Sequence, residues 1–253
     1  MPRLLAPALL ALAVLGAPVS APAQSFTDTQ RGDIETIVKS YLIAHPEVLE
    51  EAMNELQKRQ TAAESAKHEA SIAQNAEAIF NSPRGVTLGN KNGDVTFVEF
   101  FDYNCGYCKR AMADTLDLLK NDGKLKVVLK EFPVLSEGSV EAARVAVAVR
   151  MQDPTGKKYL DFHQKLLGGR GVADKARALA AAKDAGLDTA RIEKDMTSPE
   201  VKATIQENMK LAEEMGLNGT PSYVIGRQIV VGAVGLDQLK EKIGIARCGK
   251  ASC

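Results

Sequence analysis

The sequence predicts an α/β domain with an all-helical insertion, preceded by a helical arm. Three observations carry this prediction. A strand–helix–strand pattern occupies residues 95–132, a nearly continuous helical pattern follows from about 139 to 215, and a strand pair with a short helix closes the domain at 222–243. Residues 26–80 contain little Gly and much Ala, Glu, Gln and Lys, a composition that favours helix.

The arm is predicted to contain two amphipathic helices. The first carries apolar residues at helical spacing: Ile34, Ile37, Val38, Tyr41 and Leu42. Pro46 is well placed to begin the second helix, whose stripe is Val48, Leu49, Met53 and Leu56. Because a narrow stripe stabilises a lone helix poorly, we predict an oligomerisation arm in which chains bury these stripes against one another. The alternative is an arm folded back on its own domain. The pattern does not indicate the number of chains.

The α/β domain is expected to begin where the helical pattern breaks, at Asn81–Gly85. We therefore divide the chain into an arm at 24–82, a domain at 83–247 and a short tail at 248–253. Within the domain, a turn at 89–94 leads into a strand at 95–100. A helix at about 106–121 follows and ends at Gly123. The next strand, 124–132, alternates Leu and Val with Lys.

The insertion and the closing elements follow in order. Helices are expected around 142–151, 159–167, 173–185 and 199–215, the last with a clear start at Ser198-Pro199-Glu200 and a stop at Gly216. A hairpin then pairs 222–226 with 228–232 around Gly226-Arg227, and a helix at 236–243 completes the domain.

The first 23 residues are typical of a signal peptide. Arg3 provides the positive end, residues 4–14 form a short apolar stretch, and Ala21-Pro22-Ala23 offers a cleavage site before Gln24. The alternative is an uncleaved anchor, although the stretch is shorter than the ~20 residues of a membrane span. We expect an exported protein located in the periplasm. The 32 basic and 32 acidic residues balance, so nothing indicates nucleic acid or an anionic membrane as a partner.

The four cysteines form two close pairs, Cys105/Cys108 and Cys248/Cys253. Cys105 and Cys108 lie where the strand gives way to a helix, and a helix N-terminus stabilises the thiolate that exchanges disulfides. A static bridge and a metal site are the alternatives, but zinc requires four ligands and no neighbouring His or Cys completes the set. For Cys248 and Cys253 we expect a local disulfide, with a redox-active tail or a Cu(I)-binding thiol pair as alternatives.

Two motifs carry a family resemblance. Phe100-Phe101-Asp102-Tyr103-Asn104-Cys105-Gly106-Tyr107-Cys108 resembles the active-site segment of the DsbA-like branch of the thioredoxin superfamily. Gly219-Thr220-Pro221-Ser222-Tyr223 resembles the segment that carries the cis-proline of that superfamily. The likeness covers about residues 83–245 and implies a thioredoxin-like fold with a helical insert. The arm is similar to that of oligomeric members such as the suppressor-of-copper-sensitivity proteins.

The resemblance also implies roles for individual residues. Cys105 would be the solvent-facing nucleophile and Cys108 the buried resolving thiol. Pro221 would be the cis-proline beside the disulfide, and Thr220 would occupy the position that tunes the redox potential. Glu99, six residues before Cys105, would be a buried carboxylate that handles the proton of the resolving thiol.

The function implied is that of a periplasmic thiol:disulfide oxidoreductase that forms or isomerises disulfides in exported proteins. We expect unfolded or misoxidised proteins as clients, a membrane redox partner that resets the pair, a homo-oligomer, and no cofactor or metal. Because neither Gly106 nor Tyr107 is basic, we expect a milder oxidant than the most oxidising members. The alternatives are a copper-binding or copper-tolerance protein that uses the same thiols, and a chaperone-like holdase.

Overall fold

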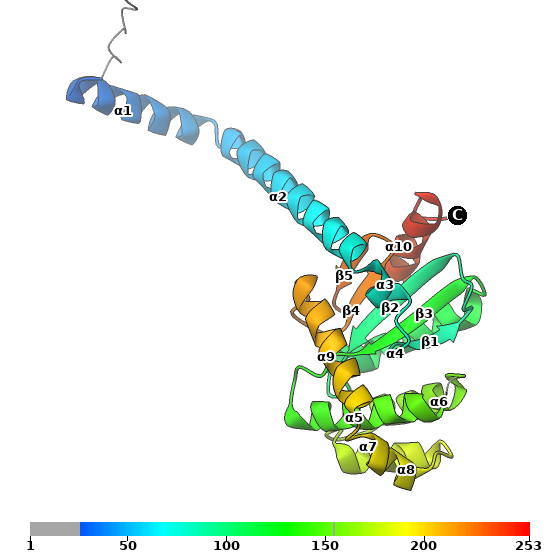
Figure 1. Ribbon diagram of the computed structural model, residues 1–253. Coiled ribbons are helices and arrows are strands. Elements are labelled where there is room, and N and C mark those ends of the chain that lie inside the picture. The colour runs from blue at the N-terminus through cyan, green and yellow to red at the C-terminus, as the bar shows by residue number, and fades with distance from the viewer. Residues whose placement is uncertain (1–25, 154) are drawn as a thin grey trace, which may run out of the picture. The chain divides into compact units, whose positions relative to one another are not determined.

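A computed structural model describes residues 26–153 and 155–253 (Figure 1). The predicted signal peptide lies outside the described residues. The chain divides into two units, with residues up to 58 in the first and 59–253 in the second. The predicted boundary at 82/83 therefore falls inside the second unit. The reason is packing, because Ile72 and Ile79 are buried in the same apolar cluster as Val98 and Phe100 of the sheet.

The first unit consists of α1 (Asp28–Ala44) and the first part of α2 (Glu47–Gln74). Thr27 begins α1 with a capping box, in which its side chain and that of Gln30 each accept a hydrogen bond from the other's backbone N–H. No described side chain between 26 and 58 is buried. The apolar stripe predicted from the sequence is thus present, and it forms no core within the single chain.

The second unit is built on a five-stranded mixed sheet with the order β1-β3-β2-β4-β5. The strands are β1 (Val86–Gly89), β2 (Val95–Phe101), β3 (Leu125–Glu131), β4 (Ser222–Ile225) and β5 (Gln228–Val231). β2 and β3 are parallel, joined by α4 (Gly106–Asn121), and the other neighbours are antiparallel. The edge strand β1 was not predicted, because four residues are too few to display a period of two.

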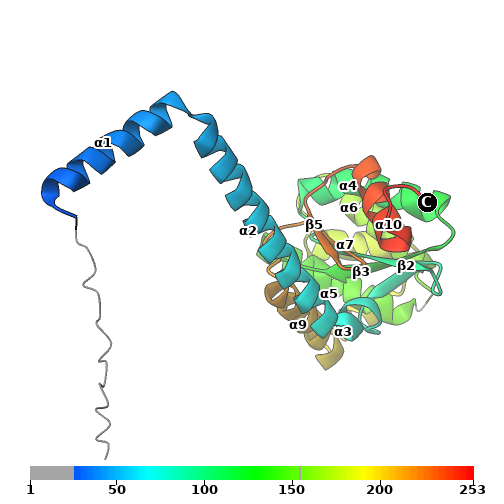
Figure 2. The ribbon, with the colours of Figure 1, turned by 90° about the horizontal axis from the view of Figure 1, so that it is seen from above.

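Helices cover both faces of this sheet (Figure 2). On one face, α3 (Ala76–Phe80) and α9 (Pro199–Glu214) pack against Val98, Phe100 and Val224. On the other face, α4 and α10 (Leu236–Cys248) pack against Phe97, Tyr223 and Ile225. The sheet is therefore buried on both faces, which explains the nearly continuous apolar composition of β2 and β3.

The helical insertion is confirmed between β3 and β4. It contains α5 (Glu137–Gln152), α6 (Lys157–Gly168), α7 (Lys175–Asp184), α8 (Thr189–Asp195) and α9. The short α8 was not predicted. Small residues such as Ala142, Ala146 and Ala182 are buried at the contacts of α5 with its neighbours, so the helices can approach closely.

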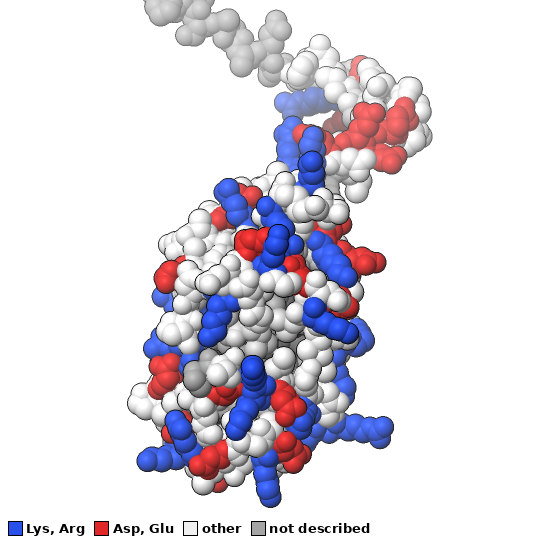
Figure 3. All heavy atoms as spheres, turned by 90° about the vertical axis from the view of Figure 1, so that its right-hand side faces the viewer, with Lys and Arg blue, Asp and Glu red and all other residues white. Residues whose placement is uncertain are grey.

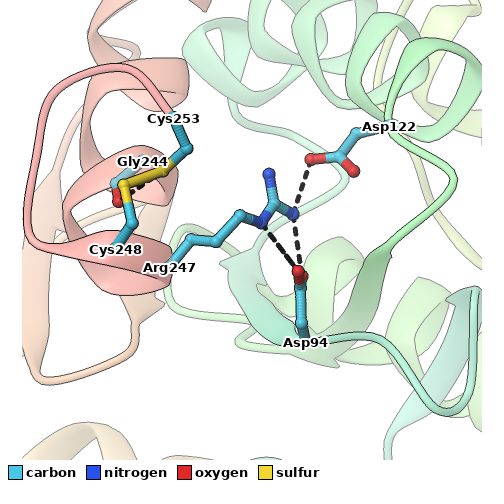
Figure 4. The surroundings of a disulfide bond; sticks show 6 residues. All are labelled: Asp94, Asp122, Gly244, Arg247, Cys248 and Cys253. Atoms are coloured by element: carbon cyan, nitrogen blue, oxygen red, sulfur yellow. Dashed lines mark hydrogen bonds and ion pairs between the residues drawn. A yellow bond between two sulfur atoms is a disulfide. The ribbon is translucent and has the colours of Figure 1, made fainter.

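The chain ends in a short closed loop on α10 (Figure 4). Cys248 and Cys253 form the expected local disulfide. A Cβ atom on Gly244 would lie 2.6 Å from the Ala251 carbonyl oxygen, so only glycine lets the tail fold back on the helix here. Arg247 forms ion pairs with Asp94 and Asp122, which join α10 to the loops before β2 and β3. Along the described part of the chain, no helix combines the length and apolar character of a membrane span.

Candidate active site

Cys105 is the N-cap residue of α4, at the junction that the sequence predicted. The Cys108 backbone N–H donates to Cys105 Sγ at 3.3 Å. The Cys105 backbone N–H donates to the Asp102 carbonyl oxygen at 3.0 Å, which closes the turn between β2 and the helix. The sulfur is thus held at the positive end of the helix with an N–H directed at it, the arrangement in which a thiolate is stabilised.

The two thiols differ in accessibility. Both are free, and Cys105 keeps 6% of its surface exposed whereas Cys108 keeps none. Burial raises the pKa of Cys108 well above its usual range, and the Glu99 carboxylate raises it further. Cys105 is the more accessible sulfur but is less exposed than a solvent-facing residue, because the loop before β4 covers it.

That covering loop contains Thr220 and Pro221. Their peptide bond is cis, as the resemblance implied, and the Cys105 thiol donates to the Thr220 carbonyl oxygen at 3.1 Å. The loop leads directly into β4, which pairs with β2, so the sheet itself brings residues 220 and 105 together across more than a hundred residues of chain.

Glu99 lies in β2 beneath α4 and is 3% exposed. Thr115 of α4 donates to its Oε2 at 2.9 Å. The pKa of Glu99 is raised to about 7. Burial is the main cause, Asp114 also raises the pKa, and the Thr115 hydrogen bond lowers it. A carboxyl group with this pKa can both accept and release a proton near neutral pH. The alternative of a water-reaching edge position is wrong, because β2 is a central strand.

Asp102 and Asn104 are functional-site residues to which no role was assigned from the sequence. Buried Asp102 accepts two backbone hydrogen bonds from Val134 and Leu135, at 2.9 and 3.0 Å, and a third bond from the hydroxyl of Ser139 at 2.7 Å. The Asn104 amide bonds the backbone N–H and C=O of Ala173, at 2.7 and 2.9 Å. These contacts attach the cysteine-bearing turn to the loop after β3 and to the helical insertion. Their only sequence signal is two polar residues directly before a helix start.

The exposed side of α4 is basic and aromatic. The Tyr107 ring is exposed, and the Arg110 guanidinium lies 4.3 Å from its centroid. Lys109 Nζ donates to the Gly169 carbonyl oxygen at 2.6 Å, which ties α4 to the end of α6. Two cations therefore lie within the first turns of the helix that Cys105 caps.

A second buried polar cluster lies behind the active-site turn. The Tyr159 hydroxyl donates to Glu131 at 2.7 Å, and the Tyr103 hydroxyl lies 3.2 Å from Nδ1 of His163. Burial raises the pKa of Glu131 well above its usual range and lowers the pKa of His163 to about 3. Burial thus disfavours the charged form of both groups, and the cluster joins the turn to α6 through hydrogen bonds.

The described residues contain no group of three or more His, Cys, Asp or Glu side chains placed to hold a metal ion. The sulfur atoms of Cys248 and Cys253 are joined to each other, so in this form they present no thiolate pair to Cu(I). On the face of residues 59–253 visible in Figure 3, Lys and Arg are interspersed with Asp and Glu.

Comparison with protein families finds two matches. Residues 96–244 match the family described as DSBA-like thioredoxin domain. Residues 30–63 match the family described as Copper resistance protein ScsC N-terminal domain. The first match contains Cys105, Cys108 and Pro221, and the second contains the apolar stripe of the arm.

Two solved structures show the likeness over most of their length. A thioredoxin-like oxidoreductase from Silicibacter pomeroyi DSS-3 is 46% identical, with a TM-score of 0.64 over 68% of this chain and 96% of that one. A linker-deletion variant of ScsC from Proteus mirabilis is 29% identical, with a TM-score of 0.66 over 89% of this chain and 98% of that one. The second likeness extends into the arm.

Curated relatives fall into two classes. Disulfide bond formation protein D of Bacillus subtilis is 25% identical over 62% of this chain and 74% of its own length. A Na(+)/H(+) antiporter NhaA of Herminiimonas arsenicoxydans is 27% identical over 56% of this chain, but the chain spans only 22% of that protein.

Proposed function

Because this chain belongs to the DSBA-like thioredoxin domain family, a family of thiol:disulfide oxidoreductases, we propose that it exchanges disulfides with exported proteins through Cys105 and Cys108. One observation carries the proposal. Cys105 Sγ lies at the start of α4, receives the Cys108 N–H, and contacts the carbonyl oxygen of Thr220 directly before Pro221. This arrangement presents one sulfur for attack and keeps the second behind it.

In the oxidative direction, a client thiolate attacks Cys105 Sγ of the disulfide form. The Cys105–Cys108 bond breaks, and Cys108 leaves and takes a proton from Glu99. A second client thiolate then attacks the client sulfur of the mixed disulfide, so that the client disulfide forms and Cys105 leaves as a thiolate. Two electrons pass from the client to the cysteine pair. In isomerisation, reduced Cys105 attacks a wrong client disulfide, and Cys108 releases complexes that stall.

The client would contact an apolar surface that is attached to the active-site turn. A shallow groove is lined largely by apolar side chains of the loop after β3, of α9 and of the segment before the cis peptide, namely Phe132, Val134, Ile205, Met209 and Leu217. Asp102 binds the backbone of Val134, so the groove and the active-site turn are attached to one another. Unfolded proteins expose apolar side chains that this surface can bind.

We propose a periplasmic location and a homo-oligomer formed through the arm. The sequence of the first 23 residues and the periplasm's oxidising chemistry support the location. The ScsC N-terminal match and the exposed stripe of α1 and α2 support the oligomer. A membrane redox partner would remove two electrons from the reduced pair or supply them. No arrangement of described residues favours the copper alternative over disulfide exchange.

Reduction of insulin by dithiothreitol, followed by turbidity, tests the proposed activity. The full-length protein should accelerate the reaction, and Cys105→Ser should abolish the acceleration. Ser252→Ala, far from the site in the C-terminal loop, serves as the control and should match the wild type. A holdase would be unaffected by Cys105→Ser, and equal rates for the wild type and that variant would contradict the proposal.

A further inference from the structure

Tyr223 lies directly opposite Glu99 in the sheet. β2 and β4 are antiparallel, and the register pairs these two residues. Directly opposed side chains of an antiparallel pair project from the same face with Cβ atoms about 5 Å apart. Both therefore project toward α4, where Thr115 donates to Glu99 and Cys108 is buried. The Tyr223 ring packs against Phe97 with its centroid 5.1 Å away.

The Tyr223 hydroxyl is fully buried and, among the described residues, has no hydrogen-bond partner. A buried hydroxyl without a partner is unfavourable and uncommon in folded proteins. The apolar packing of the ring does not require the oxygen, since phenylalanine would fill the same space. The packing of the ring therefore does not explain why a hydroxyl is present at this buried position.

The polar groups around this hydroxyl belong to the site. Burial raises the pKa of Tyr223 well above its usual range, and Glu99, Cys108, Asp114 and Cys105 raise it further. The phenol thus stays protonated and can act as a hydrogen-bond donor.

The other elements packed around Tyr223 are mostly apolar at this point. From β5 the cross-strand partner is Val230, and α10 contributes buried Leu239 and Ile243. Asp237 of α10 is a charged group that acts on this cluster, because it raises the pKa of Asp114. The acceptors that remain for the phenol are therefore acidic groups and sulfur.

We propose that Tyr223 is a positioning residue that donates its hydroxyl hydrogen bond to Glu99 when that carboxyl is ionised. The proposal rests on the proposed function and concerns its resolving step. Cys108 gives its proton to the Glu99 carboxylate, and the Cys108 thiolate attacks Cys105 Sγ. The Cys105–Cys108 bond forms, the bond from Cys105 to the client breaks, and the client leaves as a thiolate. The cysteine pair is oxidised and the client is reduced by two electrons.

The physical reason is a difference between the two states of Glu99. The buried environment opposes its ionisation, and Thr115 provides one hydrogen bond that favours the charged form. The Tyr223 hydroxyl is unpartnered in this structure, and a hydrogen bond from it to the carboxylate would favour the charged form further, because a charged acceptor binds a donor more strongly than a neutral one. Tyr223 thereby keeps Glu99 able to accept the Cys108 proton near neutral pH.

Tyr223→Phe removes only the hydroxyl, and Tyr159→Phe is the matched control. Tyr159 is equally buried, but its hydroxyl bonds Glu131 instead. Infrared difference spectra of the reduced full-length protein would follow the protonated carboxyl band of Glu99, identified by its loss in Glu99→Gln. Tyr223→Phe should raise the midpoint of this titration by roughly one pH unit, whereas Tyr159→Phe should leave it unchanged.

The pH profile of the resolving step should shift in the same direction. It is measured from the release of glutathione from a mixed disulfide with Cys105. An unchanged midpoint in Tyr223→Phe, or an equal shift in both variants, would overturn the inference. Failure of the wild type to reduce insulin would instead overturn the proposed function, and the infrared titration would still decide the role of Tyr223 because it requires no exchange.

Discussion

Glu99 affects both the proton transfer in the site and the stability of the protein. Its carboxyl is buried, and its pKa in the folded protein is raised to about 7. Between the unfolded value near 4.3 and this folded value, the unfolded chain releases a proton that the folded chain retains. Stability should therefore fall as the pH rises through this window and reach its lower level above pH 7.

Glu99→Gln should remove this pH-dependent loss. With the cysteine pair reduced, we expect the variant to match the wild type at pH 4 and to exceed its free energy of unfolding at pH 8 by up to about 3 kcal/mol. Urea unfolding at the two pH values measures the difference. The same gain at pH 4 and pH 8 would contradict a buried carboxyl with a raised pKa. Asp161→Asn, at an exposed position, keeps Glu99 and should show the same fall in stability between pH 4 and pH 8 as the wild type.

At the scale of elements, each functional part comes from a junction between a strand and the segment that follows or precedes it. Cys105 caps the N-terminus of α4, Asp102 binds the loop after β3, and the loop before β4 brings Thr220 to the sulfur. These junctions lie at the same end of the strands. The strands therefore position the loops rigidly, and the reactive residues lie in the loops.

The role of the C-terminal tail on α10 can be tested separately from the activity of the site. The disulfide between Cys248 and Cys253 closes a loop with a sequence separation of 5. For so short a loop, the loss of chain entropy in the unfolded state predicts a stabilisation of about 2 kcal/mol. Replacing both cysteines with alanine should lower the free energy of unfolding by this amount and leave insulin reduction unchanged.

Chemical unfolding and the insulin assay, run on the same preparation of the double variant, distinguish the two roles of the tail. Loss of activity with stability retained would indicate the redox-active tail that the sequence left open. The variant Ser252→Ala, in the same loop, controls for a change in the tail that keeps its disulfide.

At the scale of the whole molecule, the proposed oligomer would bring several active sites to one client, and we expect it to form through the arm. Ile37 and Met53 are 66% and 71% exposed in the single chain. Replacing both with lysine should prevent burial of the stripe, at about 1.5–3 kcal/mol for each side chain buried in the assembly. Light scattering should then show a molar mass close to that of one chain, with isomerisation of scrambled ribonuclease reduced and insulin reduction retained.

Thr36→Lys with Asn54→Lys adds the same charge at polar positions of the same helices and should leave the mass of the wild type. An equal mass for both double variants, or a wild type that is already a single chain, would contradict the arm's role. A truncation that tests the same point should end at residue 58, because Ile72 and Ile79 belong to the core of the second unit.

Most elements of the fold could be predicted because their signals are local in the chain. The β-rich run at 95–100 lies in β2, and α9 begins at Pro199 directly after its cap Ser198. Gly226, with a positive φ, lies in the turn between β4 and β5. β1 and α8 are too short for their periodicity to be recognised, and they exist because neighbouring elements hold them. The boundary between the units depends on where Ile72 and Ile79 pack. The local sequence around these residues does not predict that packing.

The sequence by itself determined the chemistry: two cysteines two residues apart at a strand–helix junction, a carboxylate six residues earlier, and a proline before a later strand. Only the tertiary structure decided which groups surround them. Thr115 reaches Glu99 from α4, Tyr223 faces it from β4, and Asp102 attaches the turn to distant loops. The physical reason is that helix caps and the alternation of apolar and polar residues in a strand depend only on residues that are neighbours along the chain. Hydrogen bonds, burial and the resulting pKa shifts arise between segments that meet only when the sheet has formed.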